Sequence, residues 1–184
     1  MDNWNDFFVL LALLAVLFGV LYLVPLLWKR LPRHRWRRHR MRREQAIRVH
    51  RRLIEIEHDG QRLAYLRKID PLAFEELLLV VAELRGWKIQ RNKRYTGDGG
   101  IDGKLWVDGQ LYLVQAKRYS SHVNRQHVAD FCRIVNRAKC RGLFIHSGRT
   151  GKAAWDEIQG TAVEIISGRR LLEFLMVVHD KQTQ

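Results

Sequence analysis

Four polar residues in the second half of the chain have side chains suited to metal-assisted hydrolysis. Asp102 offers a carboxylate oxygen and Gln115 an amide oxygen, both of which Mg²⁺ accepts, and the Ala116 carbonyl could add a third oxygen. The ammonium group of Lys117 could orient a water molecule or stabilise charge developing on a phosphate. Glu75, from a separate helix, could hold a further water molecule. Because Mg²⁺ both activates water and neutralises phosphate charge, the set suits phosphodiester hydrolysis.

A β-hairpin must bring three of these residues together. Two extended segments flank Asp108-Gly109, the strongest short signal for a two-residue hairpin turn. If the residues on either side of this turn pair, Asp102 lies directly opposite Gln115. Side chains alternate along a strand, so Gln115 and Lys117 share a face, which Asp102 joins from about 5 Å away. A bulge at the neighbouring glycines would shift this register by one residue.

The elements around the hairpin predict an α/β fold with a mixed β-sheet flanked by helices. Asp70 and Pro71 mark a helix start, and apolar residues at helical spacing follow them up to a stop at Gly86. Alternating strand and helix patterns continue to the end of the chain. The predicted helices cover about 71–85, 124–138, 151–159 and 169–178, and the predicted strands 87–90, 101–107, 110–119, 142–146 and 162–167.

Several short motifs resemble the Mrr-type restriction endonuclease domain of the PD-(D/E)xK nuclease superfamily. The resemblance covers about residues 69–175, and its middle part is fairly specific. The matching motifs are Asp70-Pro71 with Phe74-Glu75, GDGGIDG at 97–103, QAK at 115–117 and HSG at 146–148.

The resemblance implies a restriction-endonuclease-like fold and Mg²⁺-dependent cleavage of DNA, in defence against foreign or modified DNA. Asp102 resembles the metal-binding aspartate of the family and Lys117 the catalytic lysine. Gln115 stands where the wider superfamily usually has an acidic residue. Glu75 resembles the acidic residue of the first helix, although the adjacent Glu76 is an alternative.

Three further residues could touch a DNA phosphate: Ser147, Arg149 and Lys152. A plain exposed polar loop explains them equally well. A nucleotide cofactor is not expected, because His146 and Ala153 replace residues that a phosphate-binding loop would need around Gly151-Lys152.

The first 69 residues have a different composition from the rest. An uncharged run of 22 residues from Phe7 to Trp28, within residues 1–28, predicts a single transmembrane helix. Residues 29–69 carry 15 basic and 4 acidic residues and predict a basic helical connector, leaving 70–184 for the nuclease domain. The positive-inside rule then places the N-terminus outside and the catalytic domain in the cytoplasm, at the cytoplasmic membrane. The basic tract could bind lipid headgroups or nucleic acid.

Composition excludes several other classes of protein. The chain of 184 residues has a net charge of +14 and is 47% hydrophobic, which argues against a disordered tail. Its two cysteines cannot form a disulfide framework. The sequence thus predicts a membrane-anchored DNA endonuclease, which a homodimer would suit if both strands are cut. The alternatives are a non-catalytic, membrane-tethered DNA-binding protein on a nuclease-like scaffold, and a structure-specific or RNA-directed nuclease.

Overall fold

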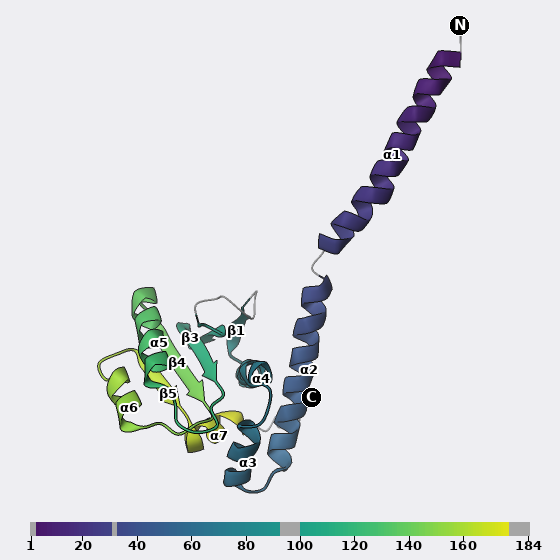
Figure 1. Cartoon of the computed structure of the whole chain (residues 1–184). Helices are drawn as coiled ribbons and strands as arrows, with labels where there is room; N and C mark the ends of the chain where they lie inside the picture. Colours follow the sequence, from purple (N-terminus) through teal and green to yellow (C-terminus); the bar gives the residue numbers. More distant parts are fainter. Residues whose placement is uncertain (1–2, 31–32, 93–99, 177–184) are drawn as a thin grey trace. The chain divides into compact units, whose positions relative to one another are not determined.

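The computed structural model describes residues 3–30, 33–92 and 100–176, with side chains described from 8 to 23 and from 39 onward within those ranges (Figure 1). The chain divides into two units, residues 1–40 and 41–184. Helix α1 spans Asn3–Arg30, and helix α2 spans Arg33–Glu55. Gly97, Asp98 and Gly99 of the glycine-rich motif lie outside the described residues, as does the end of the closing helix predicted up to residue 178.

The predicted membrane anchor is contradicted. Within the described part of the chain, no helix combines the length and the apolar character needed to cross a bilayer. The predicted single-pass location, with the N-terminus outside the cytoplasmic membrane, is therefore wrong.

A five-stranded mixed sheet forms the centre of the second unit, in the order β1-β2-β3-β4-β5. Strands β1, β2 and β3 pair antiparallel, whereas β3, β4 and β5 pair parallel. The predicted mixed sheet is thus confirmed. The strands are β1 (Lys88–Arg91), β2 (Gly103–Val107), β3 (Gln110–Lys117), β4 (Arg141–His146) and β5 (Val163–Ile166).

Helices cover both faces of this sheet (Figure 1). Helix α4 (Pro71–Leu84) and helix α7 (Gly168–Leu175) pack on one face, in a cluster that includes Val114 and Ala116 of β3. Helix α5 (Arg125–Ala138) and helix α6 (Lys152–Ile158) pack on the other, in a cluster that includes Leu113. Successive residues of β3 therefore point to opposite faces, as the pleat requires.

Caps that are visible in the sequence fix the starts of two of these helices. The Asp70 carboxylate accepts a hydrogen bond from the backbone N–H of Ala73 (3.0 Å), and Pro71 occupies the first position of α4. The Asn124 side chain accepts from the backbone N–H of Gln126 (2.9 Å) at the start of α5. The start of α4 matters for the site because Glu75 lies in its first turns.

The second half of α2 is part of the folded unit. Ala46, Val49 and Leu53 are buried in the same cluster as α4. The ring Nε2 of His50 is 2.8 Å from the carbonyl of Leu175 in α7. After α2, the chain forms helix α3 (Asp59–Leu66), which packs against α7. Residues 41–69, expected to form a connector, thus contribute to the core.

A charged cluster joins β1 to α4. Arg91 donates to the buried Glu76 (2.6 Å) and to both carboxylate oxygens of Glu83 (2.7 and 2.9 Å). Breaking a buried ion pair at one partner costs about 3 to 5 kcal/mol.

We expect Arg91→Ala to lower the free energy of unfolding by about 3 kcal/mol, because the Glu76 carboxylate would lose its guanidinium partner while staying buried. Urea unfolding followed by circular dichroism measures this change. Arg169→Ala, which removes the exposed pair with Glu173, is the matched control and should change stability by less than about 1 kcal/mol. Equal losses of stability in the two variants would show that the buried pair of Arg91 with Glu76 contributes no more than an exposed ion pair.

Candidate active site

The hairpin has the predicted register through most of its length. Val107 pairs with Gln110 across the turn, and the ladder continues to Gly103 opposite Val114. Asp108 and Gly109 both have positive φ, 49° and 79°, as a tight two-residue hairpin turn requires.

The regular pairing of β2 with β3 ends at Gly103, and Asp102 does not have its predicted position. The backbone N–H of Asp102 donates to the carbonyl of Val114 (2.8 Å), the residue already paired with Gly103. Asp102 and Gly103 therefore both oppose Val114, which is the arrangement of a β-bulge. Asp102 does not lie directly opposite Gln115, because the bulge adds one residue to β2 at this point.

The bulge turns the Asp102 side chain toward the β3 backbone. Its Oδ2 accepts a hydrogen bond from the backbone N–H of Ala116 at 2.7 Å. In a regular antiparallel ladder this N–H would bond to the carbonyl of residue 101, a carbonyl that here accepts from the Asn92 side chain. The carboxylate thus lies between the two strands, beside the QAK motif.

Gln115 provides a buried oxygen suited to a cation. Its side chain is 6% exposed, and its Oε1 has no hydrogen-bond partner. Gly100 leaves the space for this amide, since a Cβ at that position would come within 2.7 Å of the Gln115 Nε2. A buried acceptor without a donor is costly unless a cation or water satisfies it. This amide oxygen and the Asp102 carboxylate, which is bonded to the next residue of β3, are oxygens of the kind that a hard divalent cation binds. Among the described residues, no three His, Cys, Asp or Glu side chains gather into a metal site.

Lys117 ends β3 on the same side as Gln115, because both alternate with Ala116. Glu75 comes from α4, which packs on the other face of the sheet. Its carboxylate interacts electrostatically with both Asp102 and Lys117. The pKa of Glu75 is raised to about 7, mainly because burial disfavours the carboxylate and next because Asp102 is close; the Lys117 ammonium acts in the opposite direction. The four predicted residues therefore gather at one end of the β2 and β3 pair.

The structure distinguishes Glu75 from its neighbour Glu76. Glu76 is 2% exposed and bonded to Arg91, as described above. Glu75 is only half-buried and interacts with Asp102 and Lys117. Of the two glutamates, Glu75 is therefore the one that we keep in the candidate site.

We expect Glu75→Gln to stabilise the metal-free protein at high pH. The pKa of Glu75 in the folded protein, about 7, lies above its ordinary value of 4.5. Between these values the folded protein holds a proton that the unfolded chain has released, so the folded state loses stability as the pH rises to about 7. Glutamine does not ionise, and the variant should exceed the wild type at pH 8 by on the order of 1 kcal/mol, once screening at a partly exposed group is allowed for.

Thermal unfolding in EDTA at pH 5 and pH 8 measures this difference. The gap between the variant and the wild type should shrink toward pH 5, where the wild-type side chain is protonated in the folded protein. A gap of the same size at both pH values would show that Glu75 does not titrate in this range.

The residues predicted to touch phosphate differ in their surroundings. Arg149 and Lys152 are exposed, just beyond the carboxyl end of β4. Ser147 is fully buried, and its hydroxyl is bonded to both main-chain groups of Tyr119. We therefore leave Ser147 out of the phosphate-binding surface.

Sequence reasoning missed Arg42. Its guanidinium lies 2.7 Å from the Asp70 carboxylate. Its positive charge partly opposes the rise in the pKa of Glu75 that burial and Asp102 cause. The two paired residues are 28 positions apart in the chain, and no sequence pattern links them.

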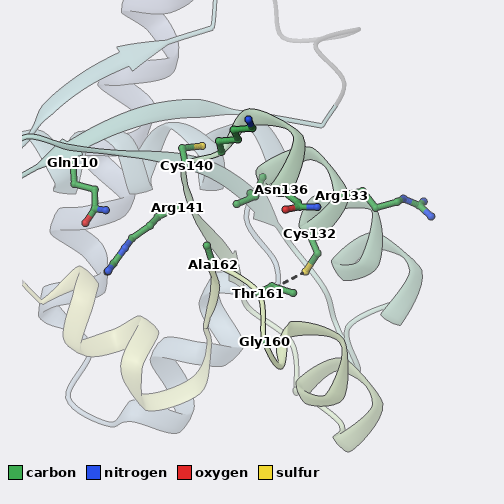
Figure 2. Close-up of a pocket in the computed structure, with 11 residues that line it drawn as sticks. Gln110, Cys132, Arg133, Asn136, Cys140, Arg141, Gly160, Thr161 and Ala162 are labelled. Atoms are coloured by element: carbon green, nitrogen blue, oxygen red, sulfur yellow. Dashed lines mark hydrogen bonds between the residues drawn. The ribbon is translucent and has the colours of Figure 1, made fainter.

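A separate hollow of about 710 Å³ lies at the opposite end of the strands (Figure 2). Its lining includes Gln110 and Arg141, the first residues of β3 and β4, whereas Lys117 is the last residue of β3. The side chains of Arg133 and Arg141 extend in different directions (Figure 2). The hollow therefore lies away from the end of β3 that carries Lys117.

Comparison with protein families identifies the class. The model of the Mrr catalytic domain, described as a restriction endonuclease, matches residues 66–175. This match covers more than half of the chain, so the chain belongs to this restriction endonuclease family. The predicted family resemblance is confirmed, and the description of the family supports the predicted enzyme class, an endodeoxyribonuclease.

Among solved structures, the chain is similar to one described as the MspJI restriction endonuclease in complex with a 27-mer oligonucleotide. The two share 22% sequence identity with a TM-score of 0.48. The similarity covers 63% of this chain and 30% of that chain, so this protein spans less than a third of the solved one. No curated protein matches the sequence.

Proposed function

We propose that this protein is a Mg²⁺-dependent DNA endonuclease whose active site is formed by Asp102, Gln115, Lys117 and Glu75. The observation that carries the proposal is the unpartnered, buried Oε1 of Gln115 beside the QAK backbone on which the Asp102 carboxylate is anchored. A carboxylate, an amide oxygen and an ammonium group at one end of a strand pair are the parts that phosphodiester hydrolysis needs.

Asp102 and Gln115 would hold the metal ion, with the Ala116 carbonyl as a further oxygen from the same strand. When bound, Mg²⁺ would supply positive charge for the phosphate oxygens and acidify a water molecule. The bond from the Ala116 N–H to Oδ2 fixes the direction of the carboxylate before any ligand arrives. Such fixed ligands need no rearrangement during the reaction.

Lys117 and Glu75 would act on the substrate and on water. The ammonium group of Lys117 donates hydrogen bonds to phosphate oxygens, where negative charge increases in the transition state. Glu75, with a pKa of about 7, is suited to accept a proton from the attacking water near neutral pH. The water oxygen then bonds to phosphorus, the bond from phosphorus to the ester oxygen of the leaving strand breaks, and that oxygen is protonated from solvent.

The surface around the site suits a polyanion. Arg149 and Lys152 are exposed beyond the end of β4, next to the strand that ends in Lys117, and we assign them to contacts with the DNA backbone. Such contacts fix position without reading sequence. A target in foreign or modified DNA fits the restriction endonuclease family.

Cleavage of matched DNA and RNA substrates tests the proposal. The full chain is incubated with supercoiled plasmid, methylated or unmethylated, and with double-stranded RNA of the same sequence, in Mg²⁺ or in EDTA. Open-circular or linear plasmid should form only with Mg²⁺, and the RNA should stay intact. Intact plasmid of both kinds in Mg²⁺ and in Mn²⁺ would overturn the proposal, and cleavage of RNA alone would replace the substrate.

A further inference from the structure

The end of β3 that bears Lys117 continues beyond the regular sheet. Lys117 pairs with His146, the last residue of β4. On the other side, β2 begins at Gly103, which pairs with Val114. The backbone from Lys117 onward is therefore held in part by contacts outside the paired strands.

Ser147 makes three of these contacts. Its backbone N–H donates to the Lys117 carbonyl (3.3 Å). Its hydroxyl accepts from the backbone N–H of Tyr119 (3.0 Å) and donates to the Tyr119 carbonyl (2.9 Å). A hydroxyl can do both at once because it carries one proton and two lone pairs. Ser147 is 0% exposed, so water does not compete for these bonds.

Lys117 is thus bracketed by two anchors from neighbouring strands. On the β2 side, the Asp102 carboxylate holds the N–H of Ala116. On the β4 side, the Ser147 hydroxyl holds both main-chain groups of Tyr119. We infer that Ser147 is a positioning residue that fixes the Lys117 ammonium for catalysis, an inference that rests on the function proposed above.

The neighbours of Lys117 are tied to the same group of residues. The Arg118 guanidinium donates to the carbonyl of Arg67 (2.5 Å), and the Arg67 Nε donates to the carbonyl of Ser147 (3.0 Å). The Tyr119 hydroxyl lies 2.5 Å from Nδ1 of His127 in α5. Every residue from 116 to 119 therefore has a specific hydrogen bond to another part of the fold, and Ser147 is the partner in three of them, one to Lys117 and two to Tyr119.

The Ser147 hydroxyl should matter more for rate than for binding. Without the hydroxyl, the N–H and the carbonyl of Tyr119 would lose their hydrogen-bond partner. Water could replace it only if the end of the strand moved. Displacement of a catalytic group by about 1 Å can lower the rate about 100-fold. The proposed metal ligand Asp102 does not depend on this hydroxyl, because its carboxylate is held by the Ala116 N–H.

Ser147→Ala in the full chain should lower kcat for plasmid cleavage by about 30- to 100-fold, with KM for DNA changed by less than about 3-fold. The affinity for Ca²⁺, which occupies Mg²⁺ sites without supporting the reaction, should stay within about 2-fold of the wild type. Ser167→Ala is the matched control, because its hydroxyl bonds to Thr150 (2.7 Å) and does not touch residues 117–119. The control should cleave at the wild-type rate.

Gly148→Ala tests the same anchor without removing a hydrogen-bonding group. A Cβ on Gly148 would come within 2.5 Å of the Ser121 carbonyl and 2.8 Å of the Tyr119 Cβ, so the segment must move. This variant should also lose at least about 10-fold in kcat with KM retained.

Chemical labelling of Lys117 reads its position independently of cleavage. Acetylation of individual lysines, followed by mass spectrometry, should become at least about 3-fold faster at Lys117 in Ser147→Ala and Gly148→Ala, relative to the exposed Lys152. Wild-type kcat in both variants, or unchanged acetylation of Lys117 in both, would overturn the positioning role. Absence of Mg²⁺-dependent cleavage by the wild type would instead overturn the proposed function, so the two failures are distinguishable.

Discussion

Replacing Asp102 with alanine is expected to lower the rate of plasmid cleavage by at least about 1,000-fold. The substitution removes the carboxylate of the proposed metal site, and Gln115 offers only a neutral oxygen. It also removes the acceptor of the Ala116 N–H, which costs about 1 to 3 kcal/mol if that group stays buried. The metal ligand and the strand anchor are thus lost together.

Cleavage rate and metal affinity should change together in this variant. Calorimetric titration with Mg²⁺ or Ca²⁺ should show at least about a 30-fold loss of affinity, while circular dichroism keeps the wild-type spectrum. Asp156→Ala, at an exposed aspartate of α6, is the matched control and should behave as the wild type. An Asp102→Ala protein that nicks plasmid within about 10-fold of the wild-type rate would exclude Asp102 from the active site.

Replacing Lys117 with alanine is expected to lower kcat by about 100- to 1,000-fold, which is the typical cost of losing one charged group that stabilises a transition state. Unlike Asp102→Ala, this variant should keep its metal affinity, because no oxygen ligand is removed. The pKa of Glu75 should rise further, since the Lys117 ammonium lowers it in the wild type.

Lys88→Ala provides the matched control for Lys117→Ala. Lys88 is exposed at the start of β1 and pairs with Trp106 near the hairpin turn, at the other end of the strands from the site, and its loss should leave kcat within about 2-fold. Cleavage kinetics with saturating DNA separate the two lysines. Equal kcat values for Lys117→Ala and the wild type would remove the ammonium group from the mechanism.

Local sequence signals predicted the hairpin because its turn has few alternatives. Asp108-Gly109 adopts the positive φ angles that such a turn demands, and the turn sets the register of the following pairs. Asp70 and Pro71 predicted the start of α4 for a similar reason, since capping depends on adjacent residues. These signals placed Asp102, Gln115 and Lys117 near one another.

Features that depend on contacts distant in sequence escaped prediction. The bulge at Asp102 arises where β2 leaves the ladder and the Asn92 side chain takes the carbonyl of Ile101. The sequence around Ser147 is typical of an exposed loop, and only the fold brings Tyr119, 28 positions away, beside it. The buried residues Ala46, Val49 and Leu53 of α2 were not predicted, because arginines occupy many of the other positions of this helix.

The predicted membrane anchor had a different basis. Hydropathy over the whole run of 22 residues supported it, whereas the described part of the chain contains no helix that meets the requirements for a span. The residues of the proposed active site lie outside that segment, in the unit that spans residues 41–184.

Crystals of the protein soaked in Mn²⁺ would test the central claim most directly, because the anomalous signal locates a divalent cation without reference to activity. We expect one peak within about 2.5 Å of both an Asp102 carboxylate oxygen and Gln115 Oε1, with the Lys117 ammonium beside it. A peak at other residues, or Asp102 and Lys117 side chains on opposite sides of the hairpin, would contradict this claim.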